Sequence, residues 1–331
     1  MTTKLKLILA TGSSFLAGIY CHKQYNLQKS NLDDPNENYH VVKRPGLPMF
    51  GTVSAASPVA IMSPALTEPA VPLLPEKTKD LIPAEPPKGY SRVAEIMRFG
   101  FPGFDNIRSR RDYVVSYDAR NRTAHWVFEH LTAESVKKRE DVDRTISNFK
   151  EDTSIHPYFR STLADYKHSG FDRGHLAAAA NHRMNQNLCD ETFLLSNMAP
   201  QVGVGFNRDK WEHLERYVRS STKIYRNVYV CTGPLYLPKT DPESGKNYVK
   251  YQVIGSNNVS VPTHFFKVMV GELEDHQLEL EAYVLPNEKI PDHCSIASFQ
   301  VQPDAVERAS GLLFFDKISR EKLARINGKR I

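Results

Sequence analysis

The sequence contains few cysteines: Cys21, Cys189, Cys231 and Cys294 are the only four in 331 residues. No two of them form the CxxC pair that is typical of structural zinc sites, so a zinc centre is not indicated. Four widely spaced thiols are also too few for a disulfide framework in a chain of this length. We therefore expect the cysteines to be buried or free thiols.

The N-terminal region lacks an apolar run long enough to span a membrane. The apolar stretch at residues 7–20, LILATGSSFLAGIY, is 14 residues long and contains the polar segment TGSS, whereas a spanning helix needs about 20 apolar residues. The first 30 residues contain four lysines and no acidic residue, which favours a mitochondrial targeting peptide within residues 1–44. Because those 30 residues also lack arginine, a secretory signal and a short membrane anchor stay open as alternatives.

Proline is concentrated in one segment. Residues 45–88 contain 10 of the 21 prolines of the chain. Proline has no amide donor and a fixed φ angle, so neither a helix nor an inner strand persists through such a segment. We predict a disordered linker over residues 45–88 and a folded domain over residues 89–331.

Net charge does not by itself assign a partner. The formal charge of the whole chain is +5, and residues 90–331 carry 34 basic and 31 acidic side chains. Basic residues are concentrated between positions 205 and 226, a segment that contains six basic and three acidic side chains. This cluster favours a surface for polyanions, although a solvated helix face is the alternative explanation.

The folded part has the pattern of a strand-rich α+β domain. Alternating or β-branched residues predict a hairpin at 112–118 and 125–131 and further strands at 192–197, 227–233, 248–255, 263–270 and 278–286. Helical spacing of Trp211, Leu214 and Val218 predicts a helix over residues 207–225. A second, short helix is predicted at 303–311, where Gly311 would end it.

A chemically reactive pattern occurs in GFDRGHLAAAANHR, residues 170–183. Neutral His175 can accept a proton from water near neutral pH, and the planar guanidinium of Arg173 can hold an anionic oxygen. The alternative is a turn histidine beside a paired Asp172 and Arg173. The four alanines that follow His175 are expected to let the backbone behind it pack closely.

The helix predicted from residue 207 adds three further polar groups. Asn207, Glu215 and Arg219 fall on one broad flank of it, at about 100° per residue, whereas Arg216 lies on the opposite side. The alternative is an N-cap asparagine followed by a solvated Glu–Arg pair, which contributes only about 0.3–0.5 kcal/mol.

Taken together, these segments resemble the DNA/RNA non-specific nucleases of the ββα-metal (His-Me finger) fold. The resemblance covers about residues 90–315, and its carrying segments are SGFDRGHLAAAANHR, DETFLLSNMAPQ, NRDKWEHLERY, NVYVCTGPLYLP, YVKYQVIG, VPTHFFKVM and ASGLLFF. It implies a central antiparallel sheet flanked by helices.

The resemblance implies a role for each matching residue. His175 would be the general base that activates the attacking water, and Asn207 the metal ligand. Glu215 would support metal-bound waters. Arg173 and Arg219 would face the substrate phosphate, and Arg144 matches a further arginine of the site. His182 and Arg183 are expected to have structural or substrate-rim roles.

The resemblance also implies the reaction and its setting. The reaction would be hydrolysis of DNA and RNA by an endonuclease with Mg²⁺, or Mn²⁺ as a substitute, to 5′-phosphate and 3′-hydroxyl ends. The protein would be a homodimer of the mitochondrial intermembrane space, released to the nucleus for DNA degradation in apoptosis. A protein inhibitor stays open as a further partner. Two alternatives stay open: an exonuclease-like mitochondrial nuclease, whose relatives often carry serine in place of Asp172, and a catalytically silent nucleic-acid-binding protein.

Overall fold

The computed structural model describes residues 91–331, so the targeting peptide and linker predicted before them lie outside the described residues. The helical elements are α2 (Arg92–Ile96), α3 (Leu163–Tyr166), α4 (Gln186–Glu191), α5 (Trp211–Ser221) and α6 (Pro303–Ser310), together with the short helical turns η2 (Arg144–Ile146), η3 (Ala179–Asn181), η4 (Leu195–Asn197), η5 (Gly203–Lys210), η6 (Ile296–Phe299) and η7 (Arg320–Lys322).

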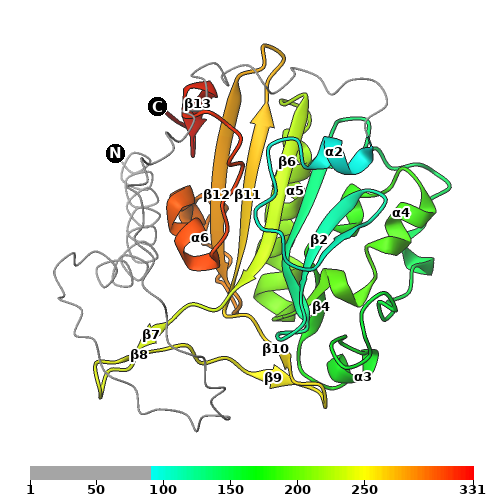
Figure 1. The fold of residues 1–331 in the computed structure, drawn as a ribbon, viewed down its shortest axis with the longest axis vertical. Helices are drawn as coiled ribbons and strands as arrows, with labels where there is room; N and C mark the ends of the chain where they lie inside the picture. The colour runs from blue at the N-terminus through cyan, green and yellow to red at the C-terminus, as the bar shows by residue number, and fades with distance from the viewer. Residues whose placement is uncertain (1–90) are drawn as a thin grey trace, which may run out of the picture.

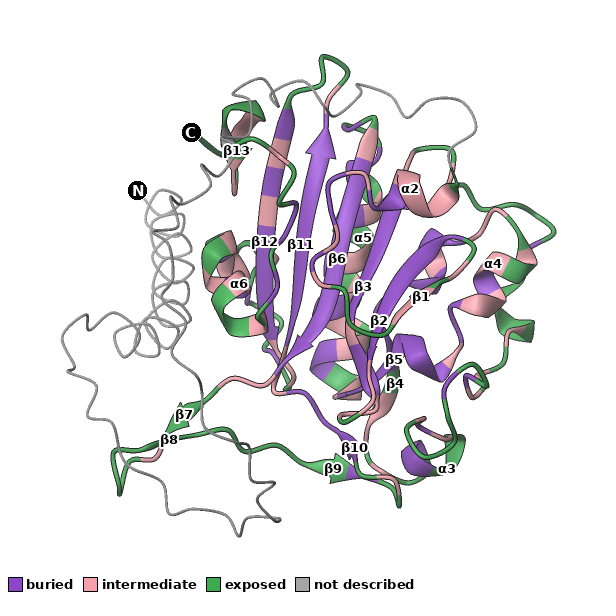
Figure 2. Ribbon diagram, viewed as in Figure 1, coloured by how far each residue is buried: buried purple, intermediate pink, exposed green. Residues whose placement is uncertain are grey.

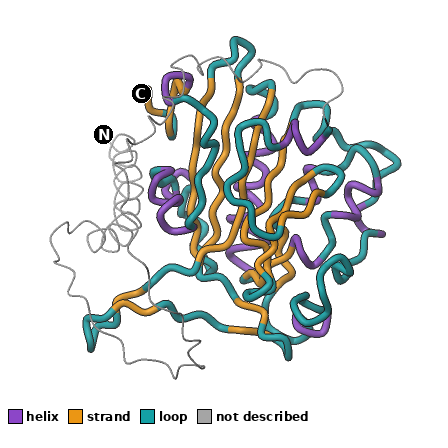
Figure 3. The backbone as a smooth tube through the Cα atoms, in the orientation of Figure 1, coloured by secondary structure: helices purple, strands orange, loops and turns teal. Residues whose placement is uncertain are grey.

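The strands form one large sheet and three short pairs (Figures 1 and 3). In spatial order, the large sheet contains β1 (Ile107–Ser109), β2 (Tyr113–Asp118), β3 (Thr123–Leu131), β6 (Asn227–Leu235), β11 (His264–Glu272), β12 (Leu278–Pro286), β13 (Leu323–Ile326) and β14 (Lys329–Arg330). All neighbours are antiparallel except β12 and β13. The short pairs are β4 (Asp172–His175) with β5 (Met198–Gln201), β7 (Lys239–Thr240) with β8 (Asn247–Tyr248), and β9 (Val253–Ile254) with β10 (Val259–Ser260).

Alternation along the long strands gives the sheet an apolar core on each face. On β3, Phe128 belongs to the core under α6, whereas Val127 belongs to the core under α5. Figure 2 shows that the central strands are buried along most of their length because helices and loops cover both faces. The predicted α+β architecture with a central antiparallel sheet is therefore confirmed.

A small unit made of β4, β5 and α5 packs on one face of the sheet. Trp211, Leu214 and Val218 of α5 are almost completely buried in the core on that face. Leu176 and Ala177, which follow β4 directly, lie in the same core. This packing fixes the end of β4 and the exposed flank of α5 relative to each other.

Two predicted strands are wrong. Residues 192–197 form the turn that follows α4 and the helical turn η4, with only an isolated bridge between Leu194 and Lys150. A short apolar run reads equally well as a buried helical segment, and here the Asn197 side chain bonds to the backbone of Ala177 in both directions. Residues 248–255 contain only the last residue of β8 and the two-residue strand β9, because the chain leaves the body of the domain there (Figure 1).

The predicted helix 207–225 is shorter at its end and irregular at its beginning. It ends at Ser221 and continues as a turn. Asn207 does not cap it: Asn207 lies inside η5, where its N–H donates to Val202 O over 2.9 Å. Gly205, at φ 87°, permits the kink that precedes Asn207. A Cβ on Gly205 would lie 2.6 Å from Lys289 Cγ.

The C-terminal helix behaves as predicted. α6 ends at Ser310 and Gly311 follows it at φ 71°, in the left-handed region that favours glycine. No helix between residues 91 and 331 is long and apolar enough to cross a membrane.

Candidate active site

All six predicted site residues line one cleft, with a volume of about 850 Å³. They come from four separate parts of the chain: Arg144 from η2, Arg173 and His175 from β4, Asn207 from η5, and Glu215 and Arg219 from α5. Their convergence results from the docking of β4 and α5 on the same face of the sheet.

His175 is a buried imidazole held between aromatic rings. It is 9% exposed, and its ring lies 4.8 Å from the ring of Phe193 and 5.9 Å from that of Phe149. Its Nε2 has no protein hydrogen-bond partner among the described residues. The glycine before it is required by space, because a Cβ on Gly174 would lie 2.0 Å from Gln201 Cδ.

The surroundings of His175 keep its ring neutral. Burial, with the nearby cations Arg144 and His182, lowers the pKa of His175 to about 3. At neutral pH the imidazole therefore retains a free nitrogen lone pair that can accept a proton.

Asn207 is oriented by Asp172, which the sequence analysis did not include in the site. The Asn207 Nδ2 donates to Asp172 Oδ2 over 2.9 Å, so its amide nitrogen is occupied and its Oδ1 is the free end in the cleft. Arg208 holds the same carboxylate with two bonds, Nε to Oδ2 at 2.8 Å and Nη2 to Oδ1 at 2.6 Å. Burial raises the pKa of Asp172, but the hydrogen bonds from Arg208 and Asn207 outweigh it and lower the pKa below its ordinary value.

Glu215 is a half-buried carboxylate on α5. Burial raises its pKa to about 7, although the buried cation Lys267 acts in the opposite direction. Lys267 lies beneath α5, donates to Thr232 Oγ1 over 2.8 Å and stands 4.8 Å from the centre of the Trp211 ring. A positive charge close to Glu215 would therefore favour its ionised form.

The three arginines occupy the cleft in different ways. The guanidinium of Arg173 stacks 4.1 Å above the centre of the Phe149 ring, an arrangement that leaves its edge free for hydrogen bonds. Arg219 donates from Nη1 to Asn181 Oδ1 over 3.2 Å. Arg144 is exposed and begins a short helical turn capped by Asp143. Three positively charged guanidinium groups therefore line the same cleft.

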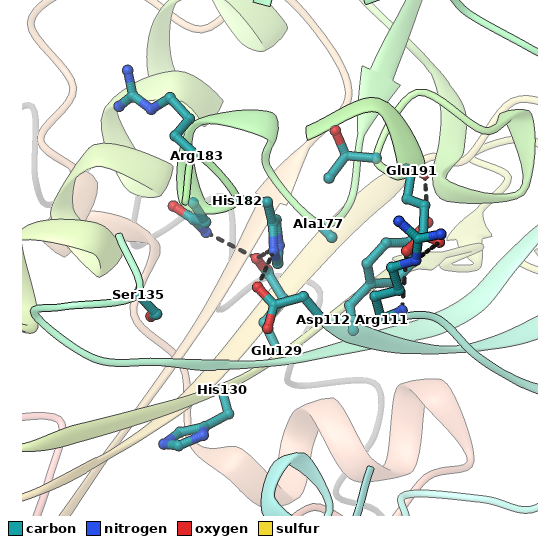
Figure 4. Close-up of polar contacts among 12 residues, drawn as sticks. Arg111, Asp112, Glu129, His130, Ser135, Ala177, His182, Arg183 and Glu191 are labelled. Carbon is teal, nitrogen blue, oxygen red and sulfur yellow. Dashed lines mark hydrogen bonds and ion pairs between the residues drawn. The ribbon is translucent and has the colours of Figure 1, made fainter. Parts of the chain in front are cut away.

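His182 is completely buried and does not line the cleft. Its Nδ1 lies 2.7 Å from Asp112 Oδ2 and its Nε2 lies 3.0 Å from Glu129 Oε1 (Figure 4). Burial alone would lower the pKa of His182, but the hydrogen bonds to the two carboxylates raise it to about 9. His182 is therefore an imidazolium that donates from both ring nitrogens. Arg183 points away from it (Figure 4).

We expect His182 to make protein stability depend on pH. Its contribution is complete below about pH 6.5, the pKa of an unfolded histidine, and is lost as pH rises through the folded pKa of about 9. The shift corresponds to about 3 kcal/mol in the free energy of unfolding. Urea unfolding at about pH 6 and about pH 10 should show a larger loss for the wild type than for His182→Gln. Equal losses in the two proteins would contradict the assignment.

The described residues contain no ready-made metal cage. Between residues 91 and 331, no group of three or more His, Cys, Asp or Glu side chains is placed to hold a metal ion. A metal in the cleft would therefore depend on the Asn207 oxygen, on water and on the substrate. That coordination suits a hard cation such as Mg²⁺, which keeps several waters, and not a structural zinc ion.

Comparisons with known proteins agree with this site. The model of the DNA/RNA non-specific endonuclease family matches residues 92–321. The chain is 50% identical over 319 residues to mitochondrial endonuclease G of Caenorhabditis elegans, covering 96% of this chain and 94% of that protein. It is 53% identical over 224 residues to mitochondrial endonuclease G of Homo sapiens, covering 68% of this chain and 74% of that protein.

A solved structure is similar as well. It is a crystal structure of the EndoG/EndoGI complex that describes the mechanism of EndoG inhibition; it has a TM-score of 0.72 and 62% identity, and the match covers 73% of this chain and 98% of that chain. The family match includes every residue of the cleft named above. The chain therefore belongs to the DNA/RNA non-specific endonuclease family and is similar to endonuclease G over most of its length.

Proposed function

We propose that this endonuclease hydrolyses phosphodiester bonds of DNA and RNA with Mg²⁺, or with Mn²⁺ as a substitute, and leaves 5′-phosphate and 3′-hydroxyl ends. The proposal rests mainly on the neutral His175, whose imidazole lines the same cleft as the Asn207 side chain. A phosphodiester needs a base for the attacking water, positive charge for the phosphate, and stabilisation of a poor leaving group. The cleft has residues suited to each need.

His175 acts as the general base in this proposal. Its imidazole takes a proton from a water molecule as the water oxygen attacks the phosphorus in line with the leaving 3′ oxygen, and that oxygen takes up a proton from water to become the 3′-hydroxyl. The aromatic rings of Phe149 and Phe193 hold the imidazole in one orientation. His175 needs no carboxylate to orient it, because these rings and the backbone of β4 do so.

The residues present fit a hard divalent cation that keeps several of its waters. Asn207 would hold it through Oδ1, whose direction is set by the bond from Nδ2 to Asp172. Glu215 would accept hydrogen bonds from the waters on the cation. When bound, the cation supplies charge stabilisation for the pentavalent transition state and lowers the barrier for departure of the leaving oxygen.

The arginines bind the phosphate and not the bases. Arg173 and Arg219 would hold its non-bridging oxygens, and Arg144 would contact the same or the next phosphate. Five cationic side chains line the cleft against three carboxylates: Arg144, Lys167, Arg173, Arg208 and Arg219 against Asp172, Glu212 and Glu215. Phosphate contacts carry no base information, so the sequence preference is loose.

The setting of the reaction is part of the same proposal. The endonuclease G relatives are named as mitochondrial proteins, and the acid-free N-terminus supports import of this chain. We place the enzyme in the intermembrane space as a homodimer, released to the nucleus when it degrades DNA in apoptosis. The inhibited complex of the related EndoG supports a protein inhibitor as a further partner.

A plasmid assay tests the function and separates the alternatives. Purified protein should nick and linearise supercoiled circular DNA with Mg²⁺, should cut RNA as well, and should lose both activities with a chelator. A circular substrate offers no end, so an exonuclease leaves it intact. A catalytically silent protein of the same fold would bind the DNA without cutting it in any metal. Either of these results would refute the proposal.

A further inference from the structure

Behind the cleft, a row of buried polar groups connects Arg219 to Arg92 of α2. Arg219 Nη1 donates to Asn181 Oδ1 over 3.2 Å, and Asn181 Nδ2 donates to Glu129 Oε1 over 2.9 Å. The same Glu129 oxygen receives the bond from His182, whose other nitrogen meets Asp112. Asn181, Glu129 and His182 each have a partner on both sides.

Burial makes this row a rigid support. Glu129 is 1% exposed, Asn181 2% and His182 0%. A buried carboxylate without a partner costs several kcal/mol, so Glu129 requires the imidazolium of His182 beside it. Asp112 balances that imidazolium and is itself held by Arg92, whose Nε donates to Oδ1 over 2.9 Å. The groups alternate in charge from Arg92 to Glu129, so none can turn away without leaving a buried charge unpaired.

The row fixes which end of the Asn181 amide faces the cleft. Its Nδ2 must point to the Glu129 carboxylate, because a carboxylate only accepts hydrogen bonds. Its Oδ1 is thereby turned towards Arg219. A neutral oxygen orients the guanidinium without cancelling its charge, whereas a carboxylate at this position would compete with the substrate phosphate.

We propose that Asn181, held by Glu129 and His182, is a positioning residue that fixes the guanidinium of Arg219 for the phosphate in the transition state. This proposal rests on the phosphate role of Arg219 in the proposed function. A free arginine side chain has many rotamers, and fixing one of them before substrate arrives reduces the entropy lost when the phosphate is bound. Asn181 acts through Arg219 and touches neither the water nor the substrate.

A double-mutant cycle tests this dependence. We expect Asn181→Ala to lower kcat for plasmid cleavage roughly 10- to 100-fold, the loss typical of a hydrogen bond to a charged group, with a smaller change in KM. In an Arg219→Ala background, the same change should lower kcat by less than about twofold, because there is no guanidinium left to position. A merely structural Asn181 would give losses that multiply, and that result would overturn the proposal.

The two single variants separate failure of the inference from failure of the proposed function. An Arg219→Ala protein with wild-type kcat would refute the phosphate role and the inference together. An inactive Arg219→Ala protein beside an unimpaired Asn181→Ala protein would refute the inference alone. Asn327→Gly is the matched control, because it removes an amide that bonds Ala282 N and Val301 O and does not line the cleft. Its φ is 49°, where glycine fits, and the variant should keep wild-type kcat.

A second pair of variants tests the same dependence by changing Glu129, in case Asn181→Ala fails to fold. Glu129→Gln keeps an oxygen that can accept from Asn181, whereas Glu129→Leu removes it. We expect the kcat of Glu129→Leu to fall as far as that of Asn181→Ala, and Glu129→Gln to recover most of the loss. Equal kcat values in these two variants would overturn the proposal, since the oxygen would then have no influence on the cleft.

Discussion

His175→Ala is expected to lower the rate of plasmid cleavage roughly 10²- to 10⁴-fold, the range that a positioned general base contributes. The imidazole is the group in the cleft whose pKa, about 3, leaves it neutral and able to accept a proton at neutral pH. KM should change far less than kcat, because the arginines that bind the phosphate remain. Initial rates of nicking with saturating Mg²⁺ measure the effect.

The control for this variant is another histidine of the same unit. His213 lies on the exposed side of α5 and does not line the cleft, so His213→Ala should cleave at the wild-type rate. Thermal unfolding is measured alongside, since removing the His175 ring leaves a gap beside Phe149 and Phe193. A folded His175→Ala protein that cuts plasmid as fast as the wild type would remove His175 from the mechanism.

Four of the candidate site residues could be proposed from the sequence because they lie on local patterns. Arg173 and His175 belong to one four-residue strand, and the spacing of Trp211, Leu214 and Val218 shows which flank of α5 is buried and which carries Glu215 and Arg219. Local spacing could not predict the backbone conformation at these residues. The segment DRGH is a strand and not a turn, and Asn207 lies in an irregular helical segment that follows the kink at Gly205.

The support of the site could not be predicted for a different reason. Asp172 reaches Asn207 across 35 residues, and Glu129 reaches Asn181 across 52. Such pairs arise only when separate strands and loops dock on the sheet. Local propensity contains no information on them, and Glu129 looks like any polar residue of a strand. The single local hint is composition: an ionisable Asp, His or Glu within a strongly apolar segment, as in HWVFEHL, needs a buried partner.

Asn207→Ala is expected to abolish the response of the enzyme to Mg²⁺. In the proposed function the Asn207 oxygen is the metal ligand, and no cage of His, Cys, Asp or Glu exists within residues 91–331 to replace it. Affinity for the metal should fall by more than the roughly 10- to 100-fold loss that follows removal of an outer partner of a metal ligand. Stability should fall by only about 1 kcal/mol, because Asp172 keeps both bonds from Arg208.

Metal binding is measured without substrate, by titration of Mn²⁺ followed by its paramagnetic resonance signal, and activity is measured across a series of Mg²⁺ concentrations. Asn187→Ala, which removes an exposed amide on α4 outside the cleft, is the matched control and should bind Mn²⁺ as the wild type does. Asp172→Asn should weaken binding less than Asn207→Ala, because it disturbs the direction of the ligand and leaves the ligand in place. An Asn207→Ala protein with unchanged Mn²⁺ affinity and an unchanged Mg²⁺ series would show that the metal is held elsewhere.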